Sequence, residues 1–241
     1  MAEALYMGDC YLKEFDAKVV SVKDGKFVVL DRTAFYPSSG GQAHDTGKII
    51  RNSDSQEFKV VFCGKFAGEI SHEIEPVEGK ELKEGDEVHG IIDWERRHRL
   101  MRMHTASHIM SGFFQKEGGA LITGNSLDTE KSRIDFSLEN FDREKIDEYI
   151  KKSNELIEKD VPIKIYNLPR EEVEKDPEMV KLAKGLPPGI KELRIVEIEG
   201  FDRQPDGGTH VKSTGEVGKI VFLKAKNQGK SNRRVYFNLE P

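Results

Sequence analysis

The hydrophobic pattern of the chain changes its period at Trp94, and this change limits the fold more than any other feature. Before Trp94, apolar residues alternate with polar ones in short runs, as in β-strands with one buried face. After it, apolar residues recur at helical spacing until Gly118. The residues expected to face inward on this helix are Leu100, Met103, Ile109, Met110 and Phe113. We therefore predict two domains, a β-rich one over residues 1–92 and a mixed α/β one over residues 93–241.

The first domain is expected to be a small β-barrel or sandwich. Asp24-Gly25 joins the runs 17–22 and 26–31 into a hairpin, because this dipeptide supplies the positive φ angles of a tight primed turn. Further short alternating runs cover residues 47–50, 57–62, 68–74 and 86–93. Many short strands separated by Gly and Asp are typical of such β folds.

The second domain is expected to combine helices with strands. A long helix is predicted over residues 142–159, and a short helical stretch precedes the turn GLPPG at 185–189. Strands are predicted at 132–138, 161–166, 192–198, 219–225 and 233–239. The two domains together indicate an α+β protein.

Composition and charge exclude several classes of protein. With 34% charged and 37% apolar residues, the chain can bury a core and is not disordered. No apolar run reaches the ~20 residues needed to cross a bilayer, and the acidic N-terminus lacks the pattern of a secretory signal. We therefore expect a cytoplasmic protein. Cys10 and Cys63 lack CxxC spacing, so neither a disulfide framework nor a cysteine-based zinc module is indicated.

Two histidines four residues apart, His104 and His108, fall inside the predicted helix. This spacing places both imidazoles on one face, close enough to share one metal ion. Taken alone, the pair fits two unrelated core or surface histidines equally well. Thr105 stands where HExxH metalloproteases have the Glu that serves as general base, which disfavours peptidase chemistry.

A third histidine, His210, closes the short segment Asp-Gly-Gly-Thr-His that begins at Asp206. Paired glycines permit a sharp turn, so both side chains can point into one pocket; by itself the segment also fits a plain turn. Three imidazoles with either a carboxylate or a water match the four-coordinate geometry of zinc. Water activated by such a metal can attack a carbonyl whose leaving group is easier than an amine, and an ester is therefore a better substrate than a peptide.

The segment TAFYPSSGGQ at 33–42 holds neutral hydrogen-bonding side chains beside Gly40 and Gly41. It has no Gly-Lys-Ser/Thr ending and no GxGxxG, so ATP binding is not expected. Its side chains suit a small polar substrate, although a structural β-loop explains the segment nearly as well.

The net charge of −5 argues against a protein that coats nucleic acid through a global positive field. Two local basic clusters are present, and each alone fits a solvated, salt-bridged face. They comprise Arg96, Arg97, Arg99 and Arg102 in one segment, and Lys224, Lys226, Lys230, Arg233 and Arg234 near the C-terminus.

Three motifs, FYPSSGGQ with the following D-x-G, HTASH, and GGTHVKSTGEVG, together resemble the editing domain of alanyl-tRNA synthetases and its free-standing relatives, the AlaX proteins. The resemblance covers nearly the whole chain and looks like the medium, AlaX-M type. It implies a translation-factor-like barrel followed by a zinc-holding α/β editing domain. It also implies a trans-editing hydrolase that removes serine, or glycine, from mischarged tRNA(Ala).

Carried over by position, the resemblance assigns His104, His108 and His210 to a catalytic zinc site, with Asp206 where most relatives have Cys. A carboxylate is a harder ligand than a thiolate, so such a site can bind zinc more weakly, accept another divalent metal, or keep three protein ligands and water. The residues expected beside the amino-acid pocket are Thr33, Gly40, Gly41, Gln42 and, by a looser alignment, Thr123.

In this interpretation the metal polarises the ester carbonyl, a polar side chain of the pocket recognises the amino acid, and the two basic clusters contact acceptor-stem phosphates. The expected partner is tRNA(Ala) rather than a membrane, and we expect a monomer. Two alternatives stay open. One is a non-catalytic tRNA-binding module with a structural or absent metal, and the other is a zinc hydrolase for a different aminoacyl or small ester.

Overall fold

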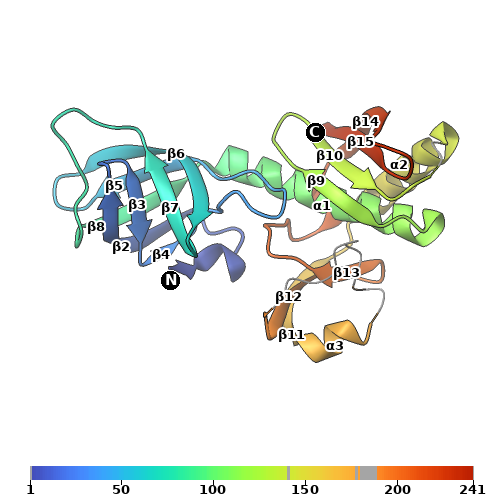
Figure 1. Cartoon of the computed structure of the whole chain (residues 1–241), viewed down its shortest axis with the longest axis horizontal. Helices are drawn as coiled ribbons and strands as arrows, with labels where there is room; N and C mark the ends of the chain where they lie inside the picture. The colour runs from blue at the N-terminus through green and yellow to red at the C-terminus, as the bar shows by residue number, and fades with distance from the viewer. Residues whose placement is uncertain (1, 140–141, 177–178, 180–188, 241) are drawn as a thin grey trace. The chain divides into compact units, whose positions relative to one another are not determined.

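The structure is a computed structural model that describes residues 2–139, 142–176, 179 and 189–240. The chain divides into two compact units, Met1–Leu100 and Met101–Pro241. Helix α1 (Trp94–Gly118) begins in the first unit and continues into the second (Figure 1). The combination of this helix with strands in both units confirms the predicted α+β class.

The first unit contains a closed β-barrel with the strand order β2-β3-β7-β6-β5-β8, which confirms the predicted N-terminal barrel. Its strands are β2 (Glu14–Lys23), β3 (Phe27–Leu30), β5 (Gly47–Arg51), β6 (Gln56–Phe66), β7 (Glu69–Ile74) and β8 (Glu87–Ile92). The short strands β1 (Glu3–Ala4) and β4 (Arg32–Thr33) pair in parallel beside the 3-10 helix η1 (Leu5–Met7). Large apolar side chains such as Phe35 and Phe58 form one buried cluster in this unit.

The predicted hairpin connects β2 to β3. Asp24 and Gly25 have φ angles of 53° and 66°, the left-handed conformation that a primed two-residue turn requires. The N–H of Lys26 donates to the carbonyl of Lys23 at 3.2 Å across this turn. In the ladder Lys23 pairs with Phe27, so Asp24, Gly25 and Lys26 lie between the paired ends of the two strands.

The second unit holds two antiparallel sheets, of order β14-β15-β10-β9 and β11-β12-β13. In chain order after α1, the elements described in this unit are β9 (Ile122–Ser126), β10 (Ser132–Phe136), α2 (Arg143–Glu158), β11 (Ile163–Pro169), α3 (Arg170–Glu174), β12 (Glu192–Ile198), β13 (Asp202–Pro205), η3 (Thr214–Glu216), β14 (Lys219–Asn227) and β15 (Arg233–Glu240). Helix α2 begins where Asp142 accepts the backbone N–H groups of Glu144 and Lys145, at 3.0 and 3.2 Å. This N-cap satisfies donors that the first helical turn leaves without partners.

The predicted helices and strands of this unit are present, and its described residues also form two further strands and the 3-10 helix η3. Strand β9 was missed because its sequence, ITGNS, has no apolar alternation, and β13 because it is only four residues long and ends in proline. Of the predicted turn at 185–189, all but Gly189 lies outside the described residues.

Helix α1 is enclosed along its middle. The predicted inward residues are all buried except Phe113, which is half-buried against Phe201 with ring centroids 4.7 Å apart. Phe114 stacks on Phe136 of β10 at 4.1 Å and meets Tyr149 of α2 edge-on at 5.0 Å. These aromatic contacts fix α1 against a sheet and a second helix. Among the described residues, no helix is both long and apolar enough to span a membrane.

Candidate metal centre

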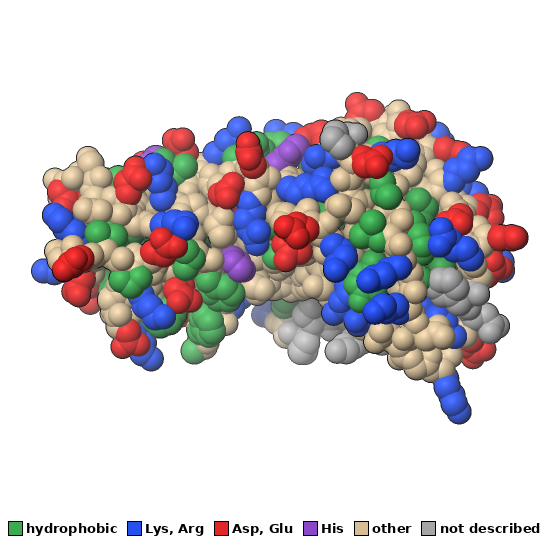
Figure 2. Space-filling model, turned by 90° about the horizontal axis from the view of Figure 1, so that it is seen from above, with side chains coloured by type: hydrophobic (Ala, Val, Ile, Leu, Met, Phe, Trp, Pro, Cys, Tyr) green, Lys and Arg blue, Asp and Glu red, His purple; other side chains and the backbone are tan. Residues whose placement is uncertain are grey.

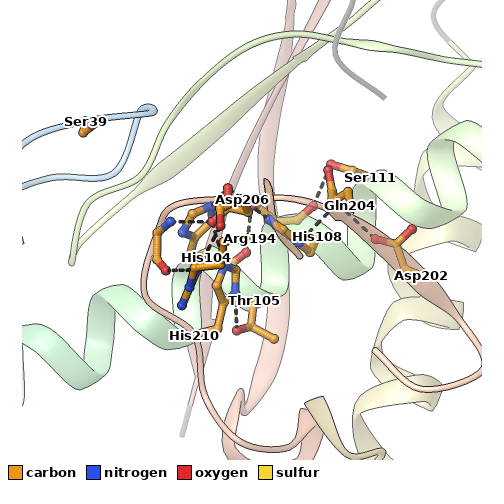
Figure 3. A network of polar contacts seen from close by, with 12 residues as sticks. Ser39, His104, Thr105, His108, Ser111, Arg194, Asp202, Gln204, Asp206 and His210 are labelled. Atoms are coloured by element: carbon orange, nitrogen blue, oxygen red, sulfur yellow. Dashed lines mark hydrogen bonds and ion pairs between the residues drawn. The ribbon is translucent and has the colours of Figure 1, made fainter. Parts of the chain in front are cut away.

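Four side chains from two distant segments converge in the second unit (Figure 3). His104 and His108 lie one turn apart on α1, with ring centroids 5.0 Å apart. His210 follows β13, and its ring lies 4.3 Å from that of His104 and 4.5 Å from that of His108. With Asp206, these residues offer four ligand atoms that all lie within 4.8 Å of one another. The structure therefore brings the four predicted ligands together.

The loop that carries Asp206 is held by polar contacts. Oδ1 of Asp206 accepts the backbone N–H of Gly208 at 2.6 Å, which is the contact that defines an Asx turn. Arg194 of β12 donates from Nη1 to the carbonyl oxygens of Asp206 and Gly208, at 2.9 Å each. Gly207 and Gly208 do not adopt positive φ angles. The turn expected from glycine freedom is thus made by a carboxylate and a guanidinium.

The carboxylate of Asp206 lies among the three imidazoles. Its Oδ1 is 3.1 Å from Nε2 of His210, and its Oδ2 is 3.5 Å from Nε2 of His104 and 3.7 Å from Nε2 of His108. Burial would raise the pKa of Asp206, but electrostatic interaction with His104 and hydrogen bonds with all three histidines hold it well below its usual value. Burial lowers the pKa of His210, and the two neighbouring histidines lower it further. A charged carboxylate and a neutral imidazole are the forms that bind metals.

Two of the histidines, His108 and His210, have side-chain partners at Nδ1, on the side of the ring that faces away from the cluster. Nε2 of Gln204 lies 3.1 Å from Nδ1 of His108 and donates to Oδ2 of Asp202 at 3.0 Å. Oγ1 of Thr105 lies 3.1 Å from Nδ1 of His210. Outer partners on Nδ1 that leave Nε2 facing the cluster are typical of metal-binding histidines. Sequence reasoning missed Gln204 and Asp202, whose only signal was their position just before the Asp-Gly-Gly turn.

The donor set fits a divalent metal ion. Three imidazole nitrogens and one carboxylate oxygen supply the number and kinds of ligand that zinc accepts. The side chains of His104, His108 and His210 are 4%, 7% and 0% exposed, whereas that of Asp206 is 22% exposed. The cluster is therefore buried except at the carboxylate, and its four side chains can hold a metal ion with one side near solvent.

The glycine-rich loop belongs to the barrel unit, where it forms a tight turn. Gly40 and Gly41 have φ angles of 58° and 89°, and the flanking Ser39 and Gln42 exchange two backbone hydrogen bonds of 3.2 and 2.9 Å. Residues without a Cβ adopt these angles readily, so the glycine pair has a clear conformational reason. Gln42 is buried, and both glycines are exposed.

The two candidate threonines already have hydrogen-bond partners. Oγ1 of Thr33 lies 2.8 Å from Nε2 of His72 and accepts the N–H of Phe35 at 3.1 Å, inside the barrel. Burial lowers the pKa of His72 to about 4, so this ring is neutral near pH 7. Thr123, in the second unit, donates its hydroxyl to Oδ1 of Asn232 at 2.8 Å. A substrate role for either threonine stays a prediction.

The acidic residue of the D-x-G motif, Asp45, forms a buried ion pair with Arg97. Both side chains are fully buried; Nε of Arg97 lies 2.9 and 3.0 Å from the two carboxylate oxygens, and its Nη1 donates to the carbonyl of Cys10 at 3.0 Å. Asp45 also accepts the N–H of Tyr36 at 2.6 Å. The pair ties the first turn of α1 to the barrel. Arg97 was therefore wrongly predicted to contact tRNA, because its guanidinium is buried and already bonded.

Arg233 requires a second correction. It is 7% exposed, and its Nη1 donates to the carbonyl oxygens of Gly229 and Asn232 at 2.9 and 3.0 Å. Arg233 thus closes the loop between β14 and β15 instead of facing a phosphate. Of the other predicted tRNA contacts, Lys224, Lys226 and Lys230 are exposed, and Arg96, Arg99, Arg102 and Arg234 are half-buried.

Comparison with known proteins first defines the class. Residues 3–96 match the family described as class II (A) tRNA synthetases. Residues 193–236 match the second additional domain of threonyl and alanyl tRNA synthetases. The second match includes the loop with Asp206 and His210. The chain is thus built of domains shared with aminoacyl-tRNA synthetases.

Full-length relatives then define the family. An alanyl-tRNA editing protein AlaX-M from Methanosarcina acetivorans is 56% identical over 99% of both chains, and that of Saccharolobus solfataricus is 46% identical over the whole of both. An alanine–tRNA ligase from Ignicoccus hospitalis is 37% identical over 92% of this chain, which spans 24% of the ligase. The chain belongs to the family of alanyl-tRNA editing proteins of the AlaX-M type.

Proposed function

We propose that the chain is a trans-editing hydrolase that removes serine from mischarged tRNA(Ala), with glycine as the second candidate amino acid. The observation that carries this proposal is the convergence of three histidines and Asp206 in a chain similar over its full length to alanyl-tRNA editing proteins. In the reaction, water adds to the ester carbonyl carbon and the bond to the ribose oxygen breaks. That oxygen takes a proton, so the products are the free amino acid and tRNA with a free terminal hydroxyl.

The proposed cofactor is one zinc ion held by His104, His108, His210 and Asp206. When bound, it supplies Lewis-acid polarisation of the carbonyl and lowers the pKa of water. Thr105 and Gln204 orient the imidazoles, because each contacts an Nδ1 atom behind the cluster. The hard oxygen ligand of Asp206 also permits another divalent metal.

Recognition of the wrong amino acid is proposed to depend on a hydroxyl-reading group among Thr33, Gln42 and Thr123. A buried site built to bond a hydroxyl rejects an analogue without it by roughly 10⁴–10⁵-fold, which suffices to spare alanine. The hydroxyl oxygens of Thr33 and Thr123 can serve only alongside their contacts with His72 and Asn232. The exposed Gly40 and Gly41 offer backbone that a ligand can approach closely.

Hydrolysis of Ser-tRNA(Ala) tests the proposal directly. Wild type should release serine, and both His104→Ala and treatment with a chelator should reduce the rate to background. His98→Ala is the matched control, because His98 lies on the same helix but stacks on Trp94 outside the cluster, at 5.4 Å between ring centroids. Its rate should equal that of wild type. Equal rates for wild type and His104→Ala would overturn the catalytic assignment.

A non-catalytic tRNA-binding module is the second candidate. It is supported by the position of Asp206, which contacts all three imidazoles and can pair with them without a catalytic metal. A module of this kind shifts tRNA in a gel and leaves the ester intact. A panel of mischarged tRNAs and simple aminoacyl esters also separates the proposed substrate from a different ester.

The organisation of the chain completes the proposal. Residues 1–92 would act as the barrel domain and residues 93–241 as the editing domain of a cytoplasmic monomer. Light scattering of the purified chain measures its mass in solution, and a mass of twice the monomer contradicts this part of the proposal.

A further inference from the structure

One face of the four-stranded sheet in the second unit collects basic residues from two separate segments. Residues that pair across antiparallel strands project to the same side of the sheet. Tyr236 of β15 pairs with Lys224 on one side and Arg133 on the other, and Arg234 pairs with Lys226 and Asp135. The intervening Val235 and Phe237 are buried on the opposite side. We call this surface the basic sheet face; it comprises Lys131, Arg133, Asp135, Lys224, Lys226, Arg234 and Tyr236.

The basic sheet face is strongly positive although the chain carries a net charge of −5. It holds five cationic side chains and one carboxylate, Asp135, which is bound by Arg234 at 2.7 and 2.8 Å and by Arg133 at 2.9 Å. Its formal charge is therefore +4. Figure 2 shows many Lys and Arg side chains, with Asp and Glu among them, on the surface of the second unit. A local basic surface on an acidic chain is the footprint expected of a nucleic-acid site.

Tyr236 orders the lysines of this face. The Nζ atoms of Lys224 and Lys131 lie 5.1 and 5.7 Å from the centre of its ring, within the range of cation–π attraction. The hydrogen bond from Arg234 lowers the pKa of Tyr236, and nearby lysines add to the effect. In the described part of the chain, neither Lys224 nor Lys226 has a carboxylate at salt-bridge distance. Tyr236 thus positions the ammonium group of Lys224, and the exposed ammonium groups of Lys224 and Lys226 are open to an external anion.

We propose that the basic sheet face binds the sugar-phosphate backbone of tRNA and supplies affinity separately from the hydrolytic site. The identity of the RNA rests on the proposed function. Lys224 and Lys226 are about 7 Å apart along one strand, given a rise of ~3.3 Å per residue, which is on the scale of neighbouring phosphates. Phosphate contacts by such groups release counterions and make binding salt-dependent. Because Asp135 is already neutralised, it adds little repulsion.

The test measures binding of uncharged tRNA(Ala) by fluorescence anisotropy at salt concentrations between roughly 50 and 200 mM. Over this range, a protein that contacts several phosphates loses affinity steeply as the salt concentration rises. The double variant Lys224→Ala/Lys226→Ala should bind about 2- to 30-fold more weakly, as for two exposed ion pairs. The slope of log affinity against log salt should fall by about 1.4–1.8. Lys145→Ala/Lys151→Ala removes the same charge from exposed positions on α2 and should bind as wild type does.

Tyr236 provides a second measurement. Tyr236→Leu removes the ring and should weaken binding, whereas Tyr236→Phe keeps the cation–π contacts and should restore it. Melting curves of all variants report folding. The proposal is overturned if the Lys224→Ala/Lys226→Ala curves superimpose on wild type, or if the α2 control weakens equally. Loss of binding to anionic phosphatidylserine vesicles without loss of tRNA binding would assign the face to a membrane surface and also overturn it.

The outcome is separable from that of the proposed function. If the double variant loses tRNA affinity but wild type does not hydrolyse Ser-tRNA(Ala), the basic sheet face stands and the hydrolase assignment fails. If wild type hydrolyses the ester and the double variant does so with unchanged KM, the hydrolase stands and the basic sheet face fails.

Discussion

Replacement of Gln204 by leucine tests how far the metal centre depends on residues behind it. Gln204 is 5% exposed, and its amide joins Nδ1 of His108 to the carboxylate of Asp202, at 3.1 and 3.0 Å. Leucine has a similar volume but no polar atom, so Gln204→Leu removes both contacts without opening a cavity. Loss of an outer partner of a ligating histidine weakens metal binding about 10–100-fold. This corresponds to about 1.4–2.7 kcal/mol.

The measurement is competition for Zn²⁺ between the purified protein and a chromophoric chelator, with circular dichroism as the check on folding. Gln228→Leu, at an exposed loop position, is the control and should bind zinc as wild type does. A folded Gln204→Leu variant with wild-type zinc affinity would refute the argument, because it would mean that α1 alone fixes the imidazole of His108.

Three further predictions address the ligand set and the barrel. Asp206→Asn keeps an oxygen for the turn with Gly208 but loses the charge, so zinc affinity should fall by more than the roughly 10–100-fold of a lost outer partner; unchanged zinc competition would leave three histidines and water as the ligands. Asp45→Ala leaves the buried Arg97 without its partner and should cost about 3–5 kcal/mol in urea unfolding, and a loss below about 1 kcal/mol would contradict the buried pair. The pKa of His72 is lowered to about 4 in the folded barrel, so the neutral ring contributes fully to the free energy of unfolding above pH ~6.5, and about 3 kcal/mol of that free energy is lost as the pH falls to ~4. His72→Gln should make the free energy of unfolding depend less on pH over this range. Equal pH dependence in wild type and His72→Gln would contradict the prediction.

Asp206 both holds its own loop in place and faces the three imidazoles of the candidate metal centre. One oxygen accepts the N–H of Gly208 and also faces His210, while the other faces His104 and His108. A cysteine at this position would offer one sulfur atom in place of the two oxygens, so it could not divide these contacts between two atoms. A carboxylate here therefore holds the loop and the imidazoles at once.

Predictions that depend on local spacing agree with the structure. The separation of His104 and His108 by four residues places them on one face of any α-helix, whatever surrounds it. The hairpin at Asp24 and Gly25 follows from the backbone angles that this dipeptide adopts. Alternating runs likewise identified the barrel strands, because one face of each strand must be buried.

The sequence did not predict which side chains from distant segments contact one another. Arg97 and Arg102 belong to one basic run, yet Arg97 is buried against Asp45 while Arg102 bonds the carbonyl of Val217. The sequence of this run shows which residues are basic, but it does not show where each side chain points. Burial of a charge is decided by its partner, and here the partner lies 52 positions away.

The chain by itself determined the change of period at Trp94, the two helical histidines and the order of the three motifs, because each is a property of neighbouring residues. Only the tertiary structure decided that Asp206 contacts all three imidazoles, that Gln204 supports His108, and that β10 contributes to the basic sheet face. These features require segments about 100 positions apart to meet in one register, since His210 pairs with Thr105 across 105 positions. Such meetings are set by the packing of the whole unit, and no local pattern encodes them.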